Sequence, residues 1–236
     1  MSQNFATTRW SMVVRATGGE SAPAGRALSE LCERYWLPLY GFARRKCSSV
    51  HDAQDLTQAF FVDLLERDLL KRADPARGRF RTFLLTAFQH FLSHQWERQR
   101  AAKRGGGRKP LSLDFAWAES RLASEPAAND DPEREFERLW GLQLLEASLE
   151  ALRLQYESRG QGRLFGILKP FMLGEQGEAR FAEAAVELGI SEGAAKVALH
   201  RLRTRYRDAL REEICATLTE ADEADDEIRR LFSAFS

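Results

Sequence analysis

Apolar residues recur at intervals of three or four along most of the chain, the spacing that places side chains on one face of an α-helix. In the first half, Leu31, Tyr35, Leu39 and Phe42 follow this spacing. The helical spacing of apolar residues resumes after SVHDAQ. The proline and glycine of DPARGRF interrupt this spacing, and it resumes again after that segment. Strand-like alternation bounded by hairpin turns is absent from this sequence pattern. The first half is therefore predicted to be all-helical.

The helical pattern is interrupted by GGGRKP, after which the chain is polar, acidic and proline-bearing up to residue 132. This composition is typical of a linker. Helical spacing resumes near Glu133 and continues to about residue 214. The expected fold class is all-α, with two small helical domains joined by a polar linker. The expected boundaries are an N-terminal extension at 1–25, a first domain at 26–104, a linker at 105–132, a second domain at 133–214 and an acidic C-terminal extension at 215–236.

Charge is segregated along the chain, although its 35 basic and 35 acidic residues cancel. Between residues 77 and 109 the Lys and Arg residues are opposed by a single acid, Glu97, and the segment 196–207 is basic and contains no acid. The balancing carboxylates lie around 114–135 and in the tail. Two separate basic blocks form a patterned surface, so the neutral average does not exclude a polyanionic partner.

The composition is that of a folded soluble protein, because 44% of the residues are apolar and the apolar runs are shorter than a membrane span. The N-terminus lacks the basic and apolar segments of an export signal. Cys32, Cys47 and Cys215 show no CxxC spacing. They are interpreted as reduced packing thiols, and the expected location is the cytoplasm, without membrane contact.

The segment ELGISEGAAKVALHRLRTRYR, at 187–207, has the features of a helix-turn-helix. Gly189 suits the turn, and Ala185, four residues earlier, is small enough for two helices to cross closely. Ile190 is expected to anchor the turn inside, and Ser191 is a good N-cap for the next helix. In such a motif the second helix enters the major groove of DNA.

The second helix of this motif is strongly basic. Its outward residues are expected to contact base edges near its start and phosphates near its ends. The candidates are Ser191, Lys196, His200, Arg201, Arg203 and Arg205. A solvated helical hairpin in a bundle would also have a charged face, but the combination of small residue, turn and cap favours DNA binding.

The segment RGRFRTFLLTAFQHFLSHQWERQRAAKRGGGRK interleaves aromatic and basic residues. Cations along a backbone path and aromatic faces are what unpaired bases require, because stacking contributes about 1–3 kcal/mol per base. Most of these rings, at helical spacing, are expected in the core, and the basic cluster at 98–104 is the better phosphate candidate. His90 and His94 lie four residues apart, but without the glutamate of HExxH or a third ligand they do not predict a metal site.

Three segments, DAQDLTQAFF, GRFRTFLLTAFQHFLSHQWERQR and ELGISEGAAKVALHRLRTRYR, resemble in order and spacing bacterial RNA polymerase sigma factors of the extracytoplasmic-function group of the sigma-70 family. The resemblance covers about residues 26–104, region two, and 133–214, region four. It implies a protein that is not an enzyme, has no cofactor, and binds core RNA polymerase and promoter DNA. The first domain would grip the polymerase clamp and melt the minus-ten element, and the second would bind the minus-thirty-five element.

The resemblance also assigns roles to individual residues. Core polymerase would be bound by Asp52, Gln54, Asp55 and Gln58. The minus-ten element would be bound and melted by Phe80, Arg81, Arg98, Arg100, Lys103 and Arg104. The minus-thirty-five element would be bound by the six helix-turn-helix candidates.

One departure from the family pattern leads to a regulatory hypothesis. The usual acidic DAED is DAQD here, so Gln54 stands in place of a carboxylate. Thr57 lies three residues later on a neighbouring helical position, and a phosphate there would add roughly −1.5 to −2 charges. A Ser/Thr kinase is thus a candidate partner, as is an anti-sigma factor. The plainer interpretation is that Thr57 is an ordinary helix residue and Gln54 an adequate polar contact.

The acidic tail EADEADDEIRRLFSAF would either shield the basic recognition helix or keep the chain soluble. Its Ile228, Leu231, Phe232 and Phe235 recur at helical spacing. A terminal helix that packs and aids solubility is the favoured interpretation.

Two other classes of protein are alternatives. A stand-alone helix-turn-helix regulator would explain the C-terminal half, but it leaves DAQDLTQ and the aromatic and basic block unexplained. A nucleic-acid enzyme would need a nucleophile or paired acids for a metal, and the basic segments contain no such acids. GGGRKP also lacks the spacing of a nucleotide-binding loop.

Overall fold

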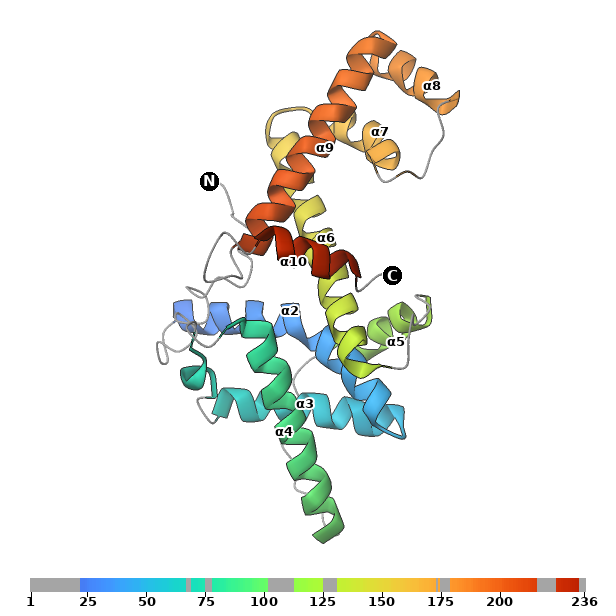
Figure 1. The fold of residues 1–236 in the computed structure, drawn as a ribbon. Coiled ribbons are helices and arrows are strands. Elements are labelled where there is room, and N and C mark those ends of the chain that lie inside the picture. Colours follow the sequence, from blue (N-terminus) through green and yellow to red (C-terminus); the bar gives the residue numbers. More distant parts are fainter. Residues whose placement is uncertain are drawn as a thin grey trace. The chain divides into compact units, whose positions relative to one another are not determined.

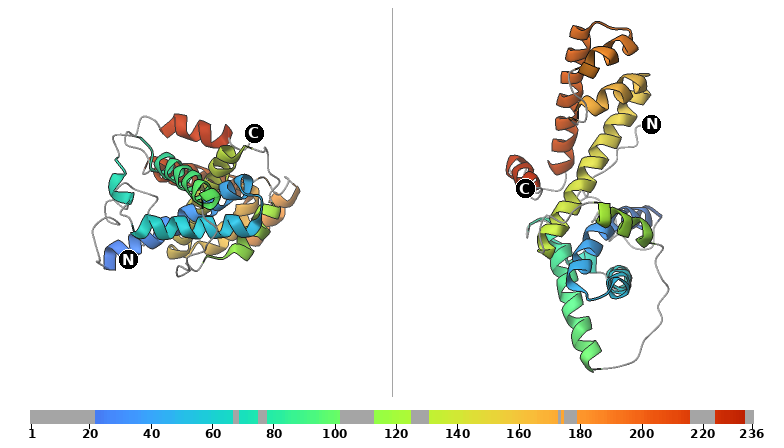
Figure 2. Two further views of the ribbon diagram at one scale, coloured as in Figure 1. Left: turned by 90° about the horizontal axis from the view of Figure 1, so that it is seen from below. Right: turned by 90° about the vertical axis from the view of Figure 1, so that its right-hand side faces the viewer.

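The computed structural model describes residues 22–66, 69–74, 78–101, 113–124, 131–172, 174, 179–215 and 224–233. Every regular element within these ranges is a helix, which confirms the predicted all-α class (Figures 1 and 2). The chain divides into two compact units. Of the described residues, the first unit contains 22–143 and 214–233, and the second unit contains 144–213.

The first unit is built from α2 (Ala22–Lys46), α3 (Val50–Glu66) and α4 (Phe80–Ala101). α3 contacts both of the other helices, and α4 lies crosswise to it, with its last turns extending beyond α3 (Figures 1 and 2). A short 3₁₀ helix, η1 (Leu69–Arg72), follows α3. Ser49 caps α3, because its Oγ accepts the backbone N–H of Asp52 at 3.0 Å.

Aromatic rings from these helices form the core of the first unit. The ring centroids of Phe60 and Phe88 lie 4.8 Å apart, and those of Tyr35 and Phe80 lie 5.5 Å apart. Burial of one such ring contributes about 1.5–3 kcal/mol. Phe80 and Phe88 from the aromatic and basic segment are thus core residues, whereas Phe91 is partly exposed.

A further helix, α5 (Phe115–Ser124), lies within the segment interpreted as a linker. Asp114 caps it by accepting the N–H of Trp117 at 2.9 Å. Glu119 then accepts hydrogen bonds from the Tyr40 hydroxyl at 2.6 Å and from Nε of Arg44 at 2.7 Å. The segment interpreted as a linker thus contains a short helix. It docks on α2 through the Glu119 carboxylate and through ring contacts of Phe115 and Trp117 with Trp36 and Tyr40.

We expect the contacts of Glu119 to make the first unit sensitive to acid. Burial raises the pKa of Glu119, but the hydrogen bonds from Arg44 and Tyr40 outweigh burial, and the pKa lies below its usual value. A carboxyl with a lowered folded-state pKa stabilises fully above its unfolded value of about 4.3, and this stabilisation is lost as the pH falls through the folded value.

Glu119→Gln should therefore lower the free energy of unfolding by about 1 kcal/mol at pH 7, and by less at about pH 2, because protonation of the wild-type carboxyl at low pH weakens the same interactions. Urea titrations at the two pH values measure both differences. Glu33→Gln, on the exposed surface of α2, is the matched control and should change little. An equal loss at both pH values would contradict the assignment.

The long helix α6 (Pro132–Ser158) begins in the first unit and continues into the second. Its first half packs closely on α2 at Gly41, where an added Cβ would lie 2.2 Å from Cδ1 of Leu139. Phe136 and Leu139 are fully buried there. The division between the units thus falls within α6, and not at the polar segment where the sequence suggested it.

The second unit contains the rest of α6, α7 (Gly162–Met172), α8 (Ala179–Leu188) and most of α9 (Glu192–Cys215). α6 ends at Ser158 and is followed by a turn at Gly160, whose φ is +69°. The N–H of Gln161 donates to the carbonyl of Tyr156 at 2.8 Å. Side chains from all four helices form one apolar core. Its buried members are Leu152, Tyr156, Phe165, Leu168, Phe171, Phe181, Ala184, Ala185, Ala195 and Leu202.

The tail forms a helix, α10 (Ala224–Ser233), that belongs to the first unit. Ala224, Glu227 and Leu231 are buried, and Ile228 is half-buried, as expected of a terminal helix that packs. Phe235 lies outside the described residues.

The cysteines at 32, 47 and 215 are free thiols. Burial raises the pKa of Cys32 to about 12 and also raises that of Cys47. A thiol that stays protonated is a poor nucleophile and a poor metal ligand. These values agree with the interpretation of both residues as packing thiols.

None of the helices in the described ranges combines the length and the apolar composition that a bilayer crossing requires.

Candidate nucleic-acid interfaces

A tight turn at Gly189 joins α8 to α9 in the second unit. Its φ of +68° is a conformation that residues with a Cβ adopt only under strain. The N–H of Ile190 donates to the carbonyl of Ala185 at 3.1 Å, which satisfies the end of α8. α9 then begins after Ser191, whose Oγ accepts the N–H of Ala194 at 3.2 Å. The turn and the cap lie where the sequence places them.

The first half of α9 has an exposed basic face formed by Lys196, His200 and Arg201. Nζ of Lys196 lies 2.7 Å from a carboxylate oxygen of Glu192, an exposed pair that contributes at most about 1 kcal/mol and is easily exchanged for a phosphate contact. Val197 is 50% exposed on the same face. Sequence reasoning missed this residue because it searched α9 for charge.

Arg203 and Arg205 make contacts inside the second unit. Nη2 of Arg203 donates to the carbonyl of Phe171 at 2.9 Å. The guanidinium of Arg205 lies over the ring of Tyr156, 5.2 Å from its centroid. These two residues therefore brace α9 against α7 and α6, which differs from the outward orientation suggested by the basic pattern.

A groove of about 720 Å³ lies along α4 in the first unit. Its other walls come from α3, from η1 and from the residues just before α4. Asp63 and Asp74 reach into it. Its basic residues are Arg72, Arg79 and Arg98, and its rings are Phe83, His90, Phe91 and His94.

The α4 residues that line this groove form two stripes of helical period. Thr82, Thr86, His90, His94 and Arg98 recur every four residues, and a second stripe beside it begins at Phe83. The first stripe is visible in the sequence. It was missed because the aromatic residues were treated as one class, and Arg72 and Arg79 were not singled out because they precede the helix.

The residues that the resemblance assigned to the minus-ten element are not brought together. Arg98 lines the groove. Phe80 is 2% exposed and Arg81 is 5% exposed, and neither lines the groove in this conformation, because the first turn of α4 directs them inward. The side chain of Arg100, together with residues 103 and 104 (Lys103 and Arg104), lies outside the part of the chain that the structure describes.

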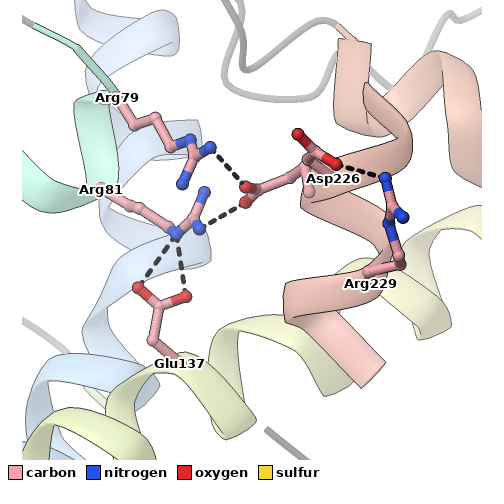
Figure 3. A network of polar contacts seen from close by, with 6 residues as sticks. Arg79, Arg81, Glu137, Asp226 and Arg229 are labelled. Atoms are coloured by element: carbon pink, nitrogen blue, oxygen red, sulfur yellow. Dashed lines mark hydrogen bonds and ion pairs between the residues drawn. The ribbon is translucent and has the colours of Figure 1, made fainter. Parts of the chain in front are cut away.

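Arg81 belongs to a buried network of charged side chains (Figure 3). Its Nε donates to the two carboxylate oxygens of Glu137 at 2.9 and 3.1 Å, and its guanidinium lies 4.2 Å from the ring centroid of Trp140. Glu227 of α10, which is fully buried, pairs with Arg81 and with Arg79, the latter at 2.9 Å. Two carboxylates thus face two guanidiniums, as buried charges require.

An acidic and amide face lies near the start of α3. Asp52 and Asp55 are exposed, whereas Gln54 and Gln58 are half-buried. The Asp52 carboxylate accepts a hydrogen bond from Ser49 Oγ at 2.7 Å, and it lies where the helix dipole favours negative charge. These four residues share one part of α3, as their sequence spacing suggested.

Gln54 lies on the side of α3 that is near Tyr40. The hydroxyl of Tyr40 donates its proton to Glu119. Burial has the largest effect on the pKa of that hydroxyl and raises it, whereas Gln54 acts on the same pKa in the lowering direction. An amide can donate to the hydroxyl oxygen, which an ionised carboxylate cannot do.

The structure argues against phosphorylation of Thr57. This residue is fully buried, and its hydroxyl donates to the carbonyl of Ala53 at 2.7 Å. A kinase could reach the hydroxyl only if α3 opened, because the folded chain covers it.

Comparison with protein families identifies a match to Sigma-70 region 2 over residues 31–102. No match was found among curated proteins or among solved structures. The matched residues include α3, η1, the groove along α4 and all but the beginning of α2. The similarity to Sigma-70 region 2 therefore lies within the first unit.

Proposed function

We propose that the chain is a sigma factor of the extracytoplasmic-function group, which directs bacterial RNA polymerase to promoters. The observation that carries the proposal is a groove of cations and rings that lies entirely within the residues matching Sigma-70 region 2. A separate unit with a basic helix after a tight turn supports it. The chain would act as a binding module through the polymerase, not as an enzyme.

The groove along α4 suits one unpaired DNA strand of the minus-ten element. Arg72 and Arg98 offer cations to phosphates, and the rings of His90, Phe91 and His94 offer faces or edges to bases. A volume of about 720 Å³ lies in the range of pockets that enclose a small ligand, so a flipped base fits. The carboxylates in the groove can accept hydrogen bonds from exocyclic amino groups of bases.

The second unit suits duplex DNA at the minus-thirty-five element. We infer that α8 and α9 act as a helix-turn-helix with the start of α9 in the major groove. Lys196 and Arg201 would donate to base edges or phosphates, and Val197 would contact a thymine methyl group. Arg203 and Arg205 would position α9 rather than touch bases.

The exposed face at the start of α3 is the candidate for binding core polymerase. Asp52 and Asp55 supply negative charge there, and Gln54 and Gln58 supply amides that are only partly buried. An acidic and polar face at a helix end is suited to a basic partner surface.

The test is to mix the purified chain with core RNA polymerase, follow their association by gel filtration, and measure run-off transcription on a genomic promoter library. The chain should co-elute with the core, and specific transcripts should require both. A chain that instead protects duplex DNA without polymerase would be a stand-alone regulator. The proposal would be overturned if the chain did not associate with core polymerase and did not support RNA synthesis.

A further inference from the structure

The carboxylate of Glu227 occupies a cationic site at the edge of the groove. Arg79, which lines the groove, and Arg81, one residue inside α4, both pair with this carboxylate. Figure 3 shows the two guanidiniums directed at α10 from the start of α4. α10 thus covers the same end of the helix that the proposed DNA strand would approach.

The pairing is incomplete for groups so deeply buried. Glu227 is 0% exposed, yet neither of its carboxylate oxygens accepts a well-aligned hydrogen bond, although both lie within ion-pair distance of a guanidinium. Nη1 of Arg81 is buried as well and has no hydrogen-bond partner within the described ranges. Burial removes water from both carboxylate oxygens of Glu227 and from Nη1 of Arg81. Their imperfect pairing offsets that loss of hydration only in part.

The apolar anchorage of α10 is small. Leu231 and Ala224 are its buried apolar residues, whereas Phe232 is 50% exposed. A ten-residue helix with these anchors and a poorly satisfied carboxylate is suited to release.

We propose that Arg79 and Arg81 form a binding site for a phosphodiester group of the DNA strand, and that Glu227 of α10 occupies this site in the free chain. The inference rests on the proposed function, since it assigns the strand that enters the groove. When α10 leaves, both guanidiniums lose the carboxylate of Glu227 while Arg81 keeps that of Glu137, so the site becomes more cationic. A phosphodiester carries one negative charge on two oxygens, as a carboxylate does, so it can take the place of Glu227 between the two guanidiniums.

The test uses the full chain with two substitutions that act on α10 in different ways. Glu227→Gln removes the competing charge, and Leu231→Ser weakens the apolar anchor without changing any charge. Asp226→Asn is the matched control, because Asp226 is exposed on the same helix and pairs with Arg229, three residues later on that helix. Circular dichroism establishes that each variant is folded.

Affinity for a fluorescent single-stranded 20-mer of mixed sequence is measured by anisotropy at several salt concentrations. Glu227→Gln and Leu231→Ser should each raise affinity by about tenfold at low salt. They should also steepen the dependence of log affinity on log salt by about 0.7, the amount that one new phosphate contact on a single strand adds. Asp226→Asn should leave both quantities near their wild-type values.

Hydrogen exchange of the unmodified chain gives a readout that requires no variant. Saturating single-stranded DNA should accelerate amide exchange in residues 224–233. The proposal is overturned if α10 keeps its protection when DNA binds, or if folded Glu227→Gln and Leu231→Ser variants bind no more tightly than Asp226→Asn. α10 would then be a structural brace.

The two proposals can fail separately. If the α10 variants bind the strand more tightly but no chain supports transcription with core polymerase, the phosphate site stands and the sigma-factor function fails. If wild-type chain directs transcription and the α10 variants show no gain in affinity, the phosphate site fails alone.

Discussion

Replacing His94 and Arg98 together with alanine should weaken binding of the unpaired promoter strand by about 10- to 100-fold, because one ring and one cation are lost from the groove. Stacking on one ring contributes about 1–3 kcal/mol, and the guanidinium adds one phosphate contact. Both side chains are exposed on the last turns of α4, so the fold should be retained. Anisotropy with a single-stranded promoter oligonucleotide and the chain–polymerase complex measures the change.

Lys71→Ala is the matched control for this variant. Lys71 is an exposed cation on η1, beside the groove but not among its lining residues. Its replacement should lower affinity far less than the double substitution. Equal losses would mean that the groove supplies only general positive charge.

Replacing Lys196 and Arg201 with alanine should lower transcription from a duplex promoter by a comparable or larger factor. A side chain that contacts a base edge contributes about 1–3 kcal/mol, so two such losses approach 2–6 kcal/mol. Both residues are exposed on α9, and neither contributes to the core of the second unit. Run-off transcription at limiting chain concentration measures the effect.

A template that is already open separates the two interfaces. With a pre-melted bubble around the minus-ten element, the groove variant should remain impaired, because it still lacks contacts to the strand. The α9 variant should remain impaired only if the duplex minus-thirty-five element is present. Arg159→Ala, an exposed arginine in the turn after α6, is the control and should behave as wild type on both templates.

Local sequence signals predicted the helices and the turn before α9 because their causes are local. Helical spacing marks the buried faces, Gly189 permits the left-handed backbone, and Ser191 caps the next helix through a residue three positions away. The same reasoning could have placed Thr57 in the core. It follows Ala53 by four residues and precedes Phe60 by three, so it lies on the apolar stripe of α3.

The misplaced residues have partners far away in the chain. Arg81 is buried because Glu137 and Glu227, from α6 and α10, neutralise it, and a local pattern of basic residues cannot show distant carboxylates. Glu119 docks α5 on α2 in a similar way, across 79 residues from Tyr40. The acidity and proline content of residues 105–132 therefore predicted a linker and did not predict the helix α5.

Permanganate reactivity of unpaired thymines, on a promoter selected by run-off transcription, tests most directly whether two modules of one chain open promoter DNA through polymerase. Thymines upstream of the start site should become reactive only when chain and core polymerase are both present, and the His94 and Arg98 double variant should abolish this reactivity. Reactive thymines that persist unchanged with the double variant, or that never appear with the wild-type chain and core, would contradict the assignment.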